Sequence, residues 1–340
     1  MSTARISCYM DDSVCNRLQD RASLDASGVK IYKKCFHLPH PLGLKRPSVW
    51  FDFEKRTITI EVSLHKFFQG HNVFGSYRIE FLCMKLIERI YQYLGLPFNA
   101  HQRDVINKHR IKLGRLDIAC SFRFNSQEEV IAALEEIFEQ LRAEGRSWAT
   151  HGSDDFETVY NQKNSKRVTD KFYSKYAEVQ QNKIPRKVKE RDRLIEISKL
   201  LLRYELTFRA PELRRLDLEF VDQWTPELMR QMIMARIDKL NLQGVIKERL
   251  SVSQLSGLNK AGQTYYKLWE QGGNLRPHRH YAPLRRARSE ILSHGIDIFR
   301  PQGAGKELSL VDLLTEDNAY FVGPKSLTRR GAIFGCGTAA

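Results

Sequence analysis

The chain has 340 residues, 42% of them hydrophobic, and carries 55 Lys and Arg against 40 Asp and Glu, a formal net charge of +15. This composition excludes general disorder, leaves room for two globular domains, and indicates a polyanionic partner, most often nucleic acid. Binding to a ribosome or a membrane surface stays open as an alternative. The six cysteines form no CxxC pair or zinc-finger spacing, which predicts reduced thiols. No apolar run has the length of a membrane span or of a signal-peptide core, so we expect a cytoplasmic protein.

The first third of the chain contains alternating strand patterns. Residues 4–10 and 29–36 are weak strand candidates, and residues 57–64 (TITIEVSL) alternate strictly between apolar and polar side chains. This alternation predicts a half-buried strand with Glu61 on its polar face. A helical spacing of apolar residues follows at 77–95.

A glycine-bracketed segment, HKFFQGHNVFG at 65–75, follows the strand directly. Gly70 and Gly75 permit a tight loop that exposes backbone groups, because glycine adopts conformations that other residues avoid. His71 and Asn72 lie between them. The loop is therefore expected at the end of the strand.

A second strictly alternating run, RLDIACSFRF at 115–124, predicts another strand. Its apolar residues, such as Leu116 and Ile118, face inward, and Asp117 lies on the opposite, polar face. The stretch 127–144 has a helical apolar stripe that can cover the apolar side of a sheet. This half of the chain is expected to be α+β.

Residues 158–173 (TVYNQKNSKRVTDKFY) form two alternating runs joined by polar residues, which predicts a hairpin. Its second strand ends at Tyr173, so we expect this phenol near solvent. Lys175 and Glu178 follow, and together the three residues combine a nucleophile, a cation and a carboxylate. A packing role for Tyr173 is the competing interpretation, favoured while this segment is considered alone.

The run RYELTFR at 203–209 is a third alternating strand, with Glu205 on the same polar side as Asp117 and Glu61. Oxygen ligands gathered in this way suit Mg²⁺ or Mn²⁺. Salt bridges to neighbouring arginines would equally satisfy each carboxylate. Periodicity alone leaves a metal site and a set of salt bridges as equal alternatives.

Beyond residue 211 the pattern becomes helical, which predicts a division into a domain at 1–210 and a basic helical domain at 211–340. The stretch 251–269 has a weak helix-turn-helix pattern. The basic residues expected to contact DNA there include Arg276, Arg279, Arg285, Arg286 and Arg288.

Three segments resemble the filamentous-phage gene II replication protein family in the same order: HKFFQGHNVFG, then GRLDIACSF at 114–122, then 158–209 with its Tyr-x-Lys-x-x-Glu motif and final strand. The resemblance covers the first two-thirds of the chain. It implies a nicking-endonuclease-like α+β fold, with an antiparallel-rich sheet covered by helices on one face and followed by a smaller helical domain. It also implies a rolling-circle replication initiator that nicks and religates one strand of a phage or plasmid double-stranded origin.

The resemblance implies roles for particular residues. Tyr173 matches the nucleophile that forms a 5′-phosphotyrosyl bond, and Lys175 and Glu178 match the family's Lys and Glu. The corresponding metal ligands for Mg²⁺ or Mn²⁺ are Asp117, Glu205 and His71, and Asn72 of the loop is expected to contact DNA. From strand alternation Glu61 joins the metal ligands, and the basic residues Lys166 and Arg167 of the hairpin are expected to contact DNA. The chain lacks the His-apolar-His motif of the wider rolling-circle superfamily, which leaves the identity of its metal ligands open.

The implied partners are origin DNA, the displaced single strand, and a host helicase and polymerase, in the cytoplasm of a bacterial host with no membrane partner. A non-catalytic DNA-binding regulator of replication or transcription is the main alternative. A tyrosine recombinase is a weaker one, because it would leave a 3′-phosphotyrosyl bond and need no metal.

Overall fold

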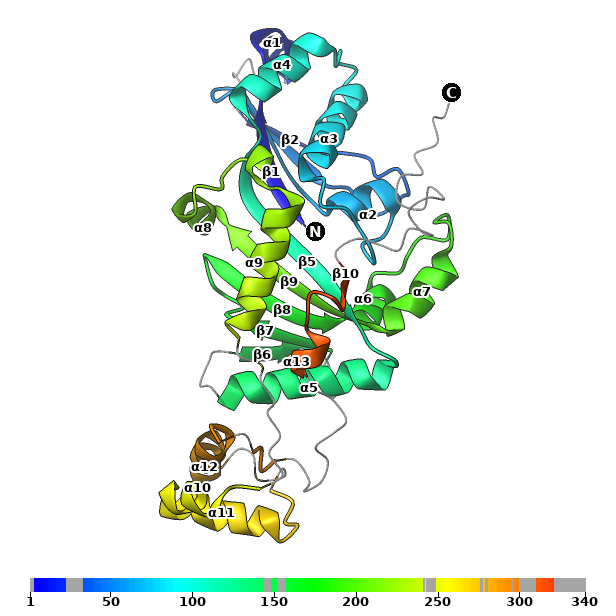
Figure 1. The fold of residues 1–340 in the computed structure, drawn as a ribbon. Coiled ribbons are helices and arrows are strands. Elements are labelled where there is room, and N and C mark those ends of the chain that lie inside the picture. The colour runs from blue at the N-terminus through cyan, green and yellow to red at the C-terminus, as the bar shows by residue number, and fades with distance from the viewer. Residues whose placement is uncertain are drawn as a thin grey trace.

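A ten-stranded sheet forms the centre of the computed structural model, in the order β2-β3-β4-β1-β5-β9-β8-β7-β6 with β10 beside β5 (Figure 1). Every strand pair among the described residues is antiparallel. The structure describes residues 3–22, 33–143, 148–151, 157–240, 242, 249–275, 278, 281–294, 296–299 and 310–320. The strands are β1 Ala4–Tyr9, β2 Lys33–His37, β3 Ser48–Asp52, β4 Thr57–Val62, β5 Lys112–Arg123, β6 Trp148–His151, β7 Thr158–Asn161, β8 Val168–Ser174, β9 Leu201–Arg209 and β10 Ala319–Tyr320.

The alternation in the long central strands separates an apolar face from a polar face, as predicted. On β5, Leu116 and Ile118 are buried in the large core, and they pair with Phe208 and Leu206 of β9 on the same face. Asp117 pairs with Thr207 and therefore lies on the polar face. The period of two along each strand thus fixes which side chains can meet across the sheet.

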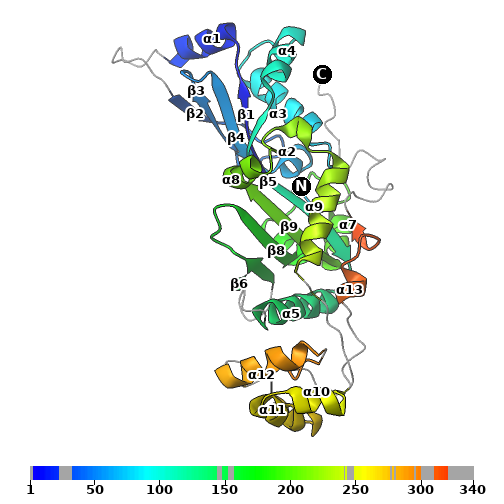
Figure 2. The same ribbon diagram turned by 60° about the vertical axis from the view of Figure 1, so that its left-hand side comes forward.

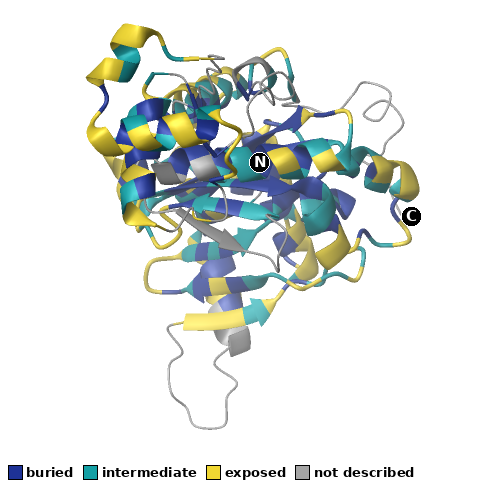
Figure 3. Cartoon of the chain, turned by 90° about the horizontal axis from the view of Figure 1, so that it is seen from below, coloured by how far each residue is buried: buried dark blue, intermediate teal, exposed yellow. Residues whose placement is uncertain are grey.

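Helices cover the apolar face, which confirms the predicted α+β class. The predicted helix at 127–144 is α5, whose buried residues pack in the same core as Phe172 and Tyr204. Many residues of the sheet and of the inner sides of the helices are buried, whereas the outer sides of the helices carry exposed residues (Figure 3). The helices are α1 Asp12–Ala22, α2 Leu64–Gln69, α3 Ile79–Tyr93, α4 Ala100–His109, α5 Gln127–Ala143, α6 Lys175–Gln181, α7 Arg191–Lys199, α8 Ala210–Arg215, α9 Pro226–Asp238, α10 Val252–Gly257, α11 Lys260–Glu270, α12 Ala282–Leu292 and α13 Leu310–Leu313, with a 3-10 turn at Val221–Gln223.

An ion pair beneath α9 fixes that helix to the sheet. Asp170 of β8 is fully buried and accepts two hydrogen bonds from Arg236 of α9, at 2.9 and 2.7 Å. The Tyr204 hydroxyl and the Asn161 amide donate to the same carboxylate, at 2.6 and 2.9 Å. A buried carboxylate with all these donors is well satisfied, so the pair specifies where α9 docks.

The hydrophobic cores do not divide at residue 210. Met229 and Ile233 of α9 lie in the large core with the sheet, and Leu310 and β10 return to it. A smaller core spans 258–299 and joins α11 and α12, and α10 to α12 lie together beyond α5 (Figure 2). The change of core therefore falls between residues 242 and 258, later than the predicted boundary.

The segment expected to be a loop at 65–75 begins with the short helix α2, and the loop itself starts at Gly70. In the described part of the chain, each helix is too short or too polar to cross a lipid bilayer. The five cysteines within it form no disulfide with one another.

Candidate active site

Tyr173 lies next to the end of β8 in the β7–β8 hairpin, as predicted, but it is not near solvent. Its side chain is only 3% exposed, and its hydroxyl donates a 3.4 Å hydrogen bond to Glu205 of β9. Burial, together with the charge of Glu205, raises the pKa of Tyr173 well above its ordinary value. The phenol is therefore protonated at neutral pH and has a carboxylate in position to accept its proton.

The loop after α2 provides part of the cover over this end of the sheet. The carbonyl of Val73 accepts a 3.3 Å hydrogen bond from Arg203, the residue that pairs with Tyr173 across β8 and β9. The Tyr77 hydroxyl donates to the carbonyl of Ala119 on β5. Alternation along β8 could not reveal this cover, because the covering residues are about a hundred positions away in sequence.

Two glycines shape this loop. Gly70 has a φ of +79° and ends α2, and a Cβ there would meet Leu42 at 2.6 Å. Gly75 approaches His65 so closely that a Cβ would lie 2.6 Å from the imidazole Nε2. The Gln69 amide ties the loop together by donating to the carbonyls of residues 71 and 74, at 3.1 and 2.7 Å.

Lys175 begins α6 and is completely buried, with its ammonium bound on two sides. It donates to Asn72 of the loop at 2.7 Å and to Glu178 at 2.5 Å. Burial lowers the pKa of Lys175 to about 7, although Glu178 opposes the shift. Glu178 also accepts from Lys66 of α2. Burial alone would raise the pKa of Glu178, but the two lysines lower it to about 2.

Asp117 and Glu205 form a second group on the polar face. Asp117 is 1% exposed and accepts two 2.8 Å hydrogen bonds from Arg115, whose guanidinium also reaches Glu61 at 3.2 Å. Burial and the negative charge of Glu205 raise the pKa of Asp117 to about 6, in spite of Arg115. The salt bridges expected as the alternative to a metal site are thus formed around Asp117.

Among the described residues, no three His, Cys, Asp or Glu side chains gather as metal ligands. Of the four predicted ligands, Asp117 and Glu205 are brought together, Glu61 is joined to Asp117 through Arg115, and His71 is buried in the loop. Two neighbouring carboxylates repel each other and fit a Mg²⁺ ion whose remaining ligands are waters and phosphate oxygens. The requirement for a metal stays a prediction.

Three cations of the site were not assigned to it from the sequence, although Arg203 was placed on its polar face as a salt-bridge partner. Arg203 is buried and donates to the Ser121 hydroxyl at 3.3 Å, Lys171 holds its ammonium 4.0 Å from the centre of the Tyr173 ring, and Lys66 binds Glu178. Lys171 shares a face with Tyr173, so the period of two could have revealed it. Lys66 is separated from Glu178 by 112 positions, and no local pattern connects them.

The predicted DNA contacts have different environments. Lys166, Arg285 and Arg286 are exposed, and Arg167 is exposed beside Glu212, to which it donates at 3.1 Å. Two of the residues predicted to contact DNA are buried in the protein. Asn72 is buried and holds Lys175. Arg288 is 3% exposed because Asp297 binds its guanidinium at 2.6 and 2.5 Å. Arg276 and Arg279 lie outside the described residues.

Sequence comparisons relate the chain to phage replication proteins. Residues 50–227, a little more than half of the chain, match the family described as the N-terminal part of the phage replication-associated gene II protein. The replication-associated gene II protein of Enterobacteria phage I2-2 is 29% identical over 238 residues, which cover 68% of this chain and 67% of that protein. A rolling circle replication initiator protein from Geobacillus stearothermophilus aligns with a TM-score of 0.31 at 12% identity, over 68% of this chain and 83% of that one, a likeness too low to carry an argument.

Proposed function

The chain belongs to the family of phage replication-associated gene II proteins, and we propose that it is a rolling-circle replication initiator that nicks one strand of a double-stranded origin through Tyr173. The observation that carries the choice of residue is the Tyr173 hydroxyl directed at Glu205 on a sheet face that also holds Asp117, Arg203 and Lys171. A nucleophile beside a base and several cations is the arrangement that phosphoryl transfer requires.

In the proposed reaction, Tyr173 Oη forms a bond to phosphorus while the bond from phosphorus to the 3′ oxygen breaks. The phenolic proton passes to Glu205, and the 3′ oxygen leaves with the bonding electrons and takes a proton from water. The product is a 5′-phosphotyrosyl strand with a free 3′-hydroxyl, which a host helicase and polymerase would use. Reversal of the same exchange would religate the strand, since the phosphodiester bond energy is conserved.

The surrounding side chains would stabilise charge and position Lys175. Arg203 and Lys171 supply positive charge for the phosphorane, and Asn72 and Glu178 hold Lys175 as a further cation. With its low pKa of about 2, Glu178 is a poor proton acceptor at neutral pH, so orientation of Lys175 is its proposed role. Because Tyr173 is buried, we infer that the Lys171 ammonium moves from the Tyr173 ring to the phosphate when DNA binds.

Asp117 and Glu205 are the residues that would hold Mg²⁺ or Mn²⁺, which would polarise a non-bridging phosphate oxygen. Arg115 occupies both oxygens of Asp117 in the present arrangement. A bound cation would compete with it, and Arg115 has Glu61 as a second partner to which it can turn.

A nicking assay tests this function. Supercoiled plasmid that carries the cognate origin is incubated with the protein, with and without Mg²⁺, and the 5′ end at the nick is labelled. Open circles with label bound to protein are the expected result. Binding without open circles would make the chain a non-catalytic regulator, and label on a 3′ phosphate would indicate a recombinase.

A further inference from the structure

Three arginines lie side by side across the polar face of the sheet, at the end farther from Tyr173. Arg5 of β1 pairs with Arg115 of β5, and Arg115 pairs with Arg209 of β9. Like charges in directly opposite positions of neighbouring strands destabilise a sheet. Such a row is retained at a cost to stability, which suggests an anion that binds across it.

The local backbone helps to form this row. The register between β1 and β5 shifts after Arg5, so Gly114 is the extra residue of a bulge immediately before Arg115. A Cβ at Gly114 would be in ordinary van der Waals contact with the Arg5 side chain, at 3.4 Å. Bulges commonly redirect side chains next to functional sites.

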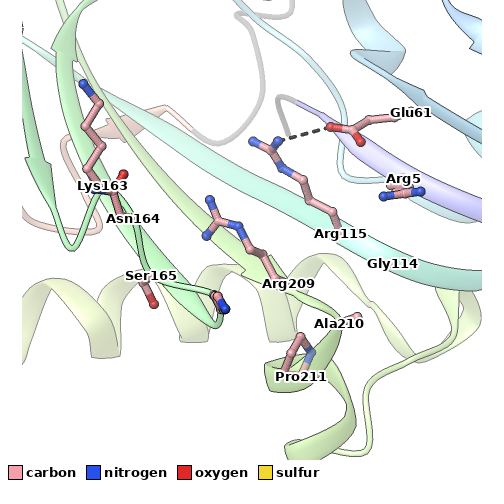
Figure 4. Close-up of a pocket in the computed structure, with 11 residues that line it drawn as sticks. Arg5, Glu61, Gly114, Arg115, Lys163, Asn164, Ser165, Arg209, Ala210 and Pro211 are labelled. Carbon is pink, nitrogen blue, oxygen red and sulfur yellow. Dashed lines mark hydrogen bonds and ion pairs between the residues drawn. The ribbon is translucent and has the colours of Figure 1, made fainter.

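A groove of about 490 Å³ contains the row. Lys163 and Lys166, from the turn between β7 and β8, add two more cations to its lining, against the single carboxylate of Glu61. Arg115 and Arg209 project from adjacent strands on the same side of the sheet (Figure 4). An open groove with five cations and one anion has the charge that favours phosphate groups.

The existing contacts leave much of this charge available. Arg115 is paired with Asp117 and Glu61, whereas Arg209 donates to the neutral hydroxyl of Thr169 at 2.8 Å. Arg5 is exposed, and within the described ranges it forms no ion pair. The positive charge of the groove is therefore only partly neutralised by the carboxylates around it.

The groove lies on the same sheet face as the candidate active site. Arg209 and Arg203 are six positions apart on β9, which corresponds to about 20 Å along a strand, and Glu205 and Thr207 lie between them on the same face. On the other side, Trp50 of β3 pairs with Thr59, which pairs with Ser7 of β1, so Trp50 belongs to this face as well. It is 42% exposed, an unusual position for tryptophan in a sheet.

We propose that this groove binds successive phosphates of single-stranded DNA, and that Trp50 stacks on a base of the same strand. The sheet face would then lead the strand toward Tyr173. Single strands suit this surface because grooves that bind them combine backbone-tracking cations with exposed aromatic rings. The identification of the ligand as DNA rests on the proposed nicking function.

The test measures binding of a fluorescein-labelled oligothymidylate of about twenty nucleotides by anisotropy, over a series of NaCl concentrations. Arg5→Gln and Arg209→Gln should each lower the slope of log K against log [NaCl] by about 0.7, the value for one phosphate contact on a single strand. Arg89→Gln, the same charge change on exposed α3, is the control and should leave the slope unchanged. Trp50→Leu should weaken binding by about tenfold or more without changing the slope.

Equal slopes for Arg5→Gln, Arg209→Gln and Arg89→Gln would overturn the groove, as would a slope change seen only with a duplex of the same length. Unchanged affinity in Trp50→Leu would overturn the stacking. Urea midpoints equal to that of the wild type exclude misfolding as the cause. The nicking assay tests the proposed function separately. If the wild-type protein nicks and both groove variants bind the oligonucleotide normally, only the proposal for the groove is refuted. If binding is salt-sensitive but no nicking occurs, only the proposed nicking function is refuted.

Discussion

At the scale of single residues, the buried phenol of Tyr173 is the group on which the proposed chemistry depends. Tyr173→Phe removes one oxygen and keeps the ring, so the variant should fold and bind origin DNA. It should lose nicking by several orders of magnitude, because no other group replaces the nucleophile. Open-circle formation and transfer of label to protein are the measurements, and Tyr176→Phe is the matched control.

The same comparison can also assign the nucleophile to another tyrosine. A Tyr173→Phe protein that still acquires label, mapped by peptide to Tyr176, would place the covalent bond three residues on. Full nicking without any adduct would refute the covalent mechanism and favour a metal-activated water.

The two coupled carboxylates are tested by Asp117→Asn and Glu205→Gln, which keep shape and remove charge. Each should abolish nicking across a Mg²⁺ titration and leave the salt dependence of DNA binding nearly unchanged. Glu61→Gln should lower nicking less than either of these variants, since Glu61 contacts Asp117 only through Arg115. Normal nicking by Asp117→Asn would instead make that carboxylate a structural partner of Arg115.

Glu178 provides a prediction about pH and stability. Its pKa in the folded protein, about 2, is below the ordinary value of 4.5, so the folded state binds this proton less tightly than the unfolded chain. Glu178 therefore stabilises the fold above pH 4.5, and this contribution is lost as the pH falls through about 2. A pKa shift of this size corresponds to a contribution of about 3 kcal/mol to the free energy of unfolding.

Glu178→Gln should consequently be less stable than the wild type at pH 7, and the difference in urea midpoint should shrink steadily as the pH is lowered toward 3. Lys66 and Lys175 lose their shared counter-charge in this variant, which is the physical reason. A difference that stays constant with pH would show that the loss comes from packing and not from charge.

At the scale of elements, the loop at 70–77 joins α2, the polar face and α6. Gly75→Ala would put a Cβ 2.6 Å from the His65 ring, so the loop or the ring must shift. We expect a loss of about 1–3 kcal/mol in the free energy of unfolding. Nicking should fall as well, because Asn72 holds Lys175 from this loop.

Urea unfolding and the nicking assay measure both effects of Gly75→Ala. Gly257→Ala is the control, because a Cβ at that position meets no atom within 4 Å. Equal stability and activity in the two variants would mean that the loop adapts without consequence for the site.

At the scale of the whole molecule, the chain has a large core around the sheet and a small helical core at 258–299. We expect the exposed Arg285 and Arg286 of α12 to contact duplex origin DNA. The double variant Arg285→Gln and Arg286→Gln should bind the origin duplex more weakly, with a salt slope smaller by about 2. Its nicking of pre-melted origin DNA should be nearly normal.

Arg288→Gln serves as the contrast within the same helix. Its guanidinium is bound to Asp297 inside the small core. This change should therefore lower the free energy of unfolding, in addition to any effect on the salt slope of DNA binding. A double variant at 285 and 286 that binds duplex with the wild-type slope would refute DNA contact by this face of α12.

Local alternation was enough to assign several parts of the molecule. The strands at 57–64, 115–124 and 203–209, the hairpin that ends at Tyr173 and the helix at 127–144 follow from periods of two and 3.6, because an apolar face must be buried. The same periods put Asp117 and Glu205 on one face. Charge along the chain indicated nucleic acid, and the rare loop sequence at 65–75 indicated the family.

The remaining features depend on contacts between residues distant in sequence, which no local period encodes. Tyr173 is buried because a loop from a hundred residues earlier packs near it, and the pKa of Lys175 falls because α6 and that loop exclude water from it. Arg288 was predicted to lie at the surface, but it is buried in an ion pair with Asp297. Helix α9 packs on the sheet, where Arg236 forms an ion pair with Asp170. Solvent access and ion pairing are properties of the packed chain, so only the tertiary structure could decide them.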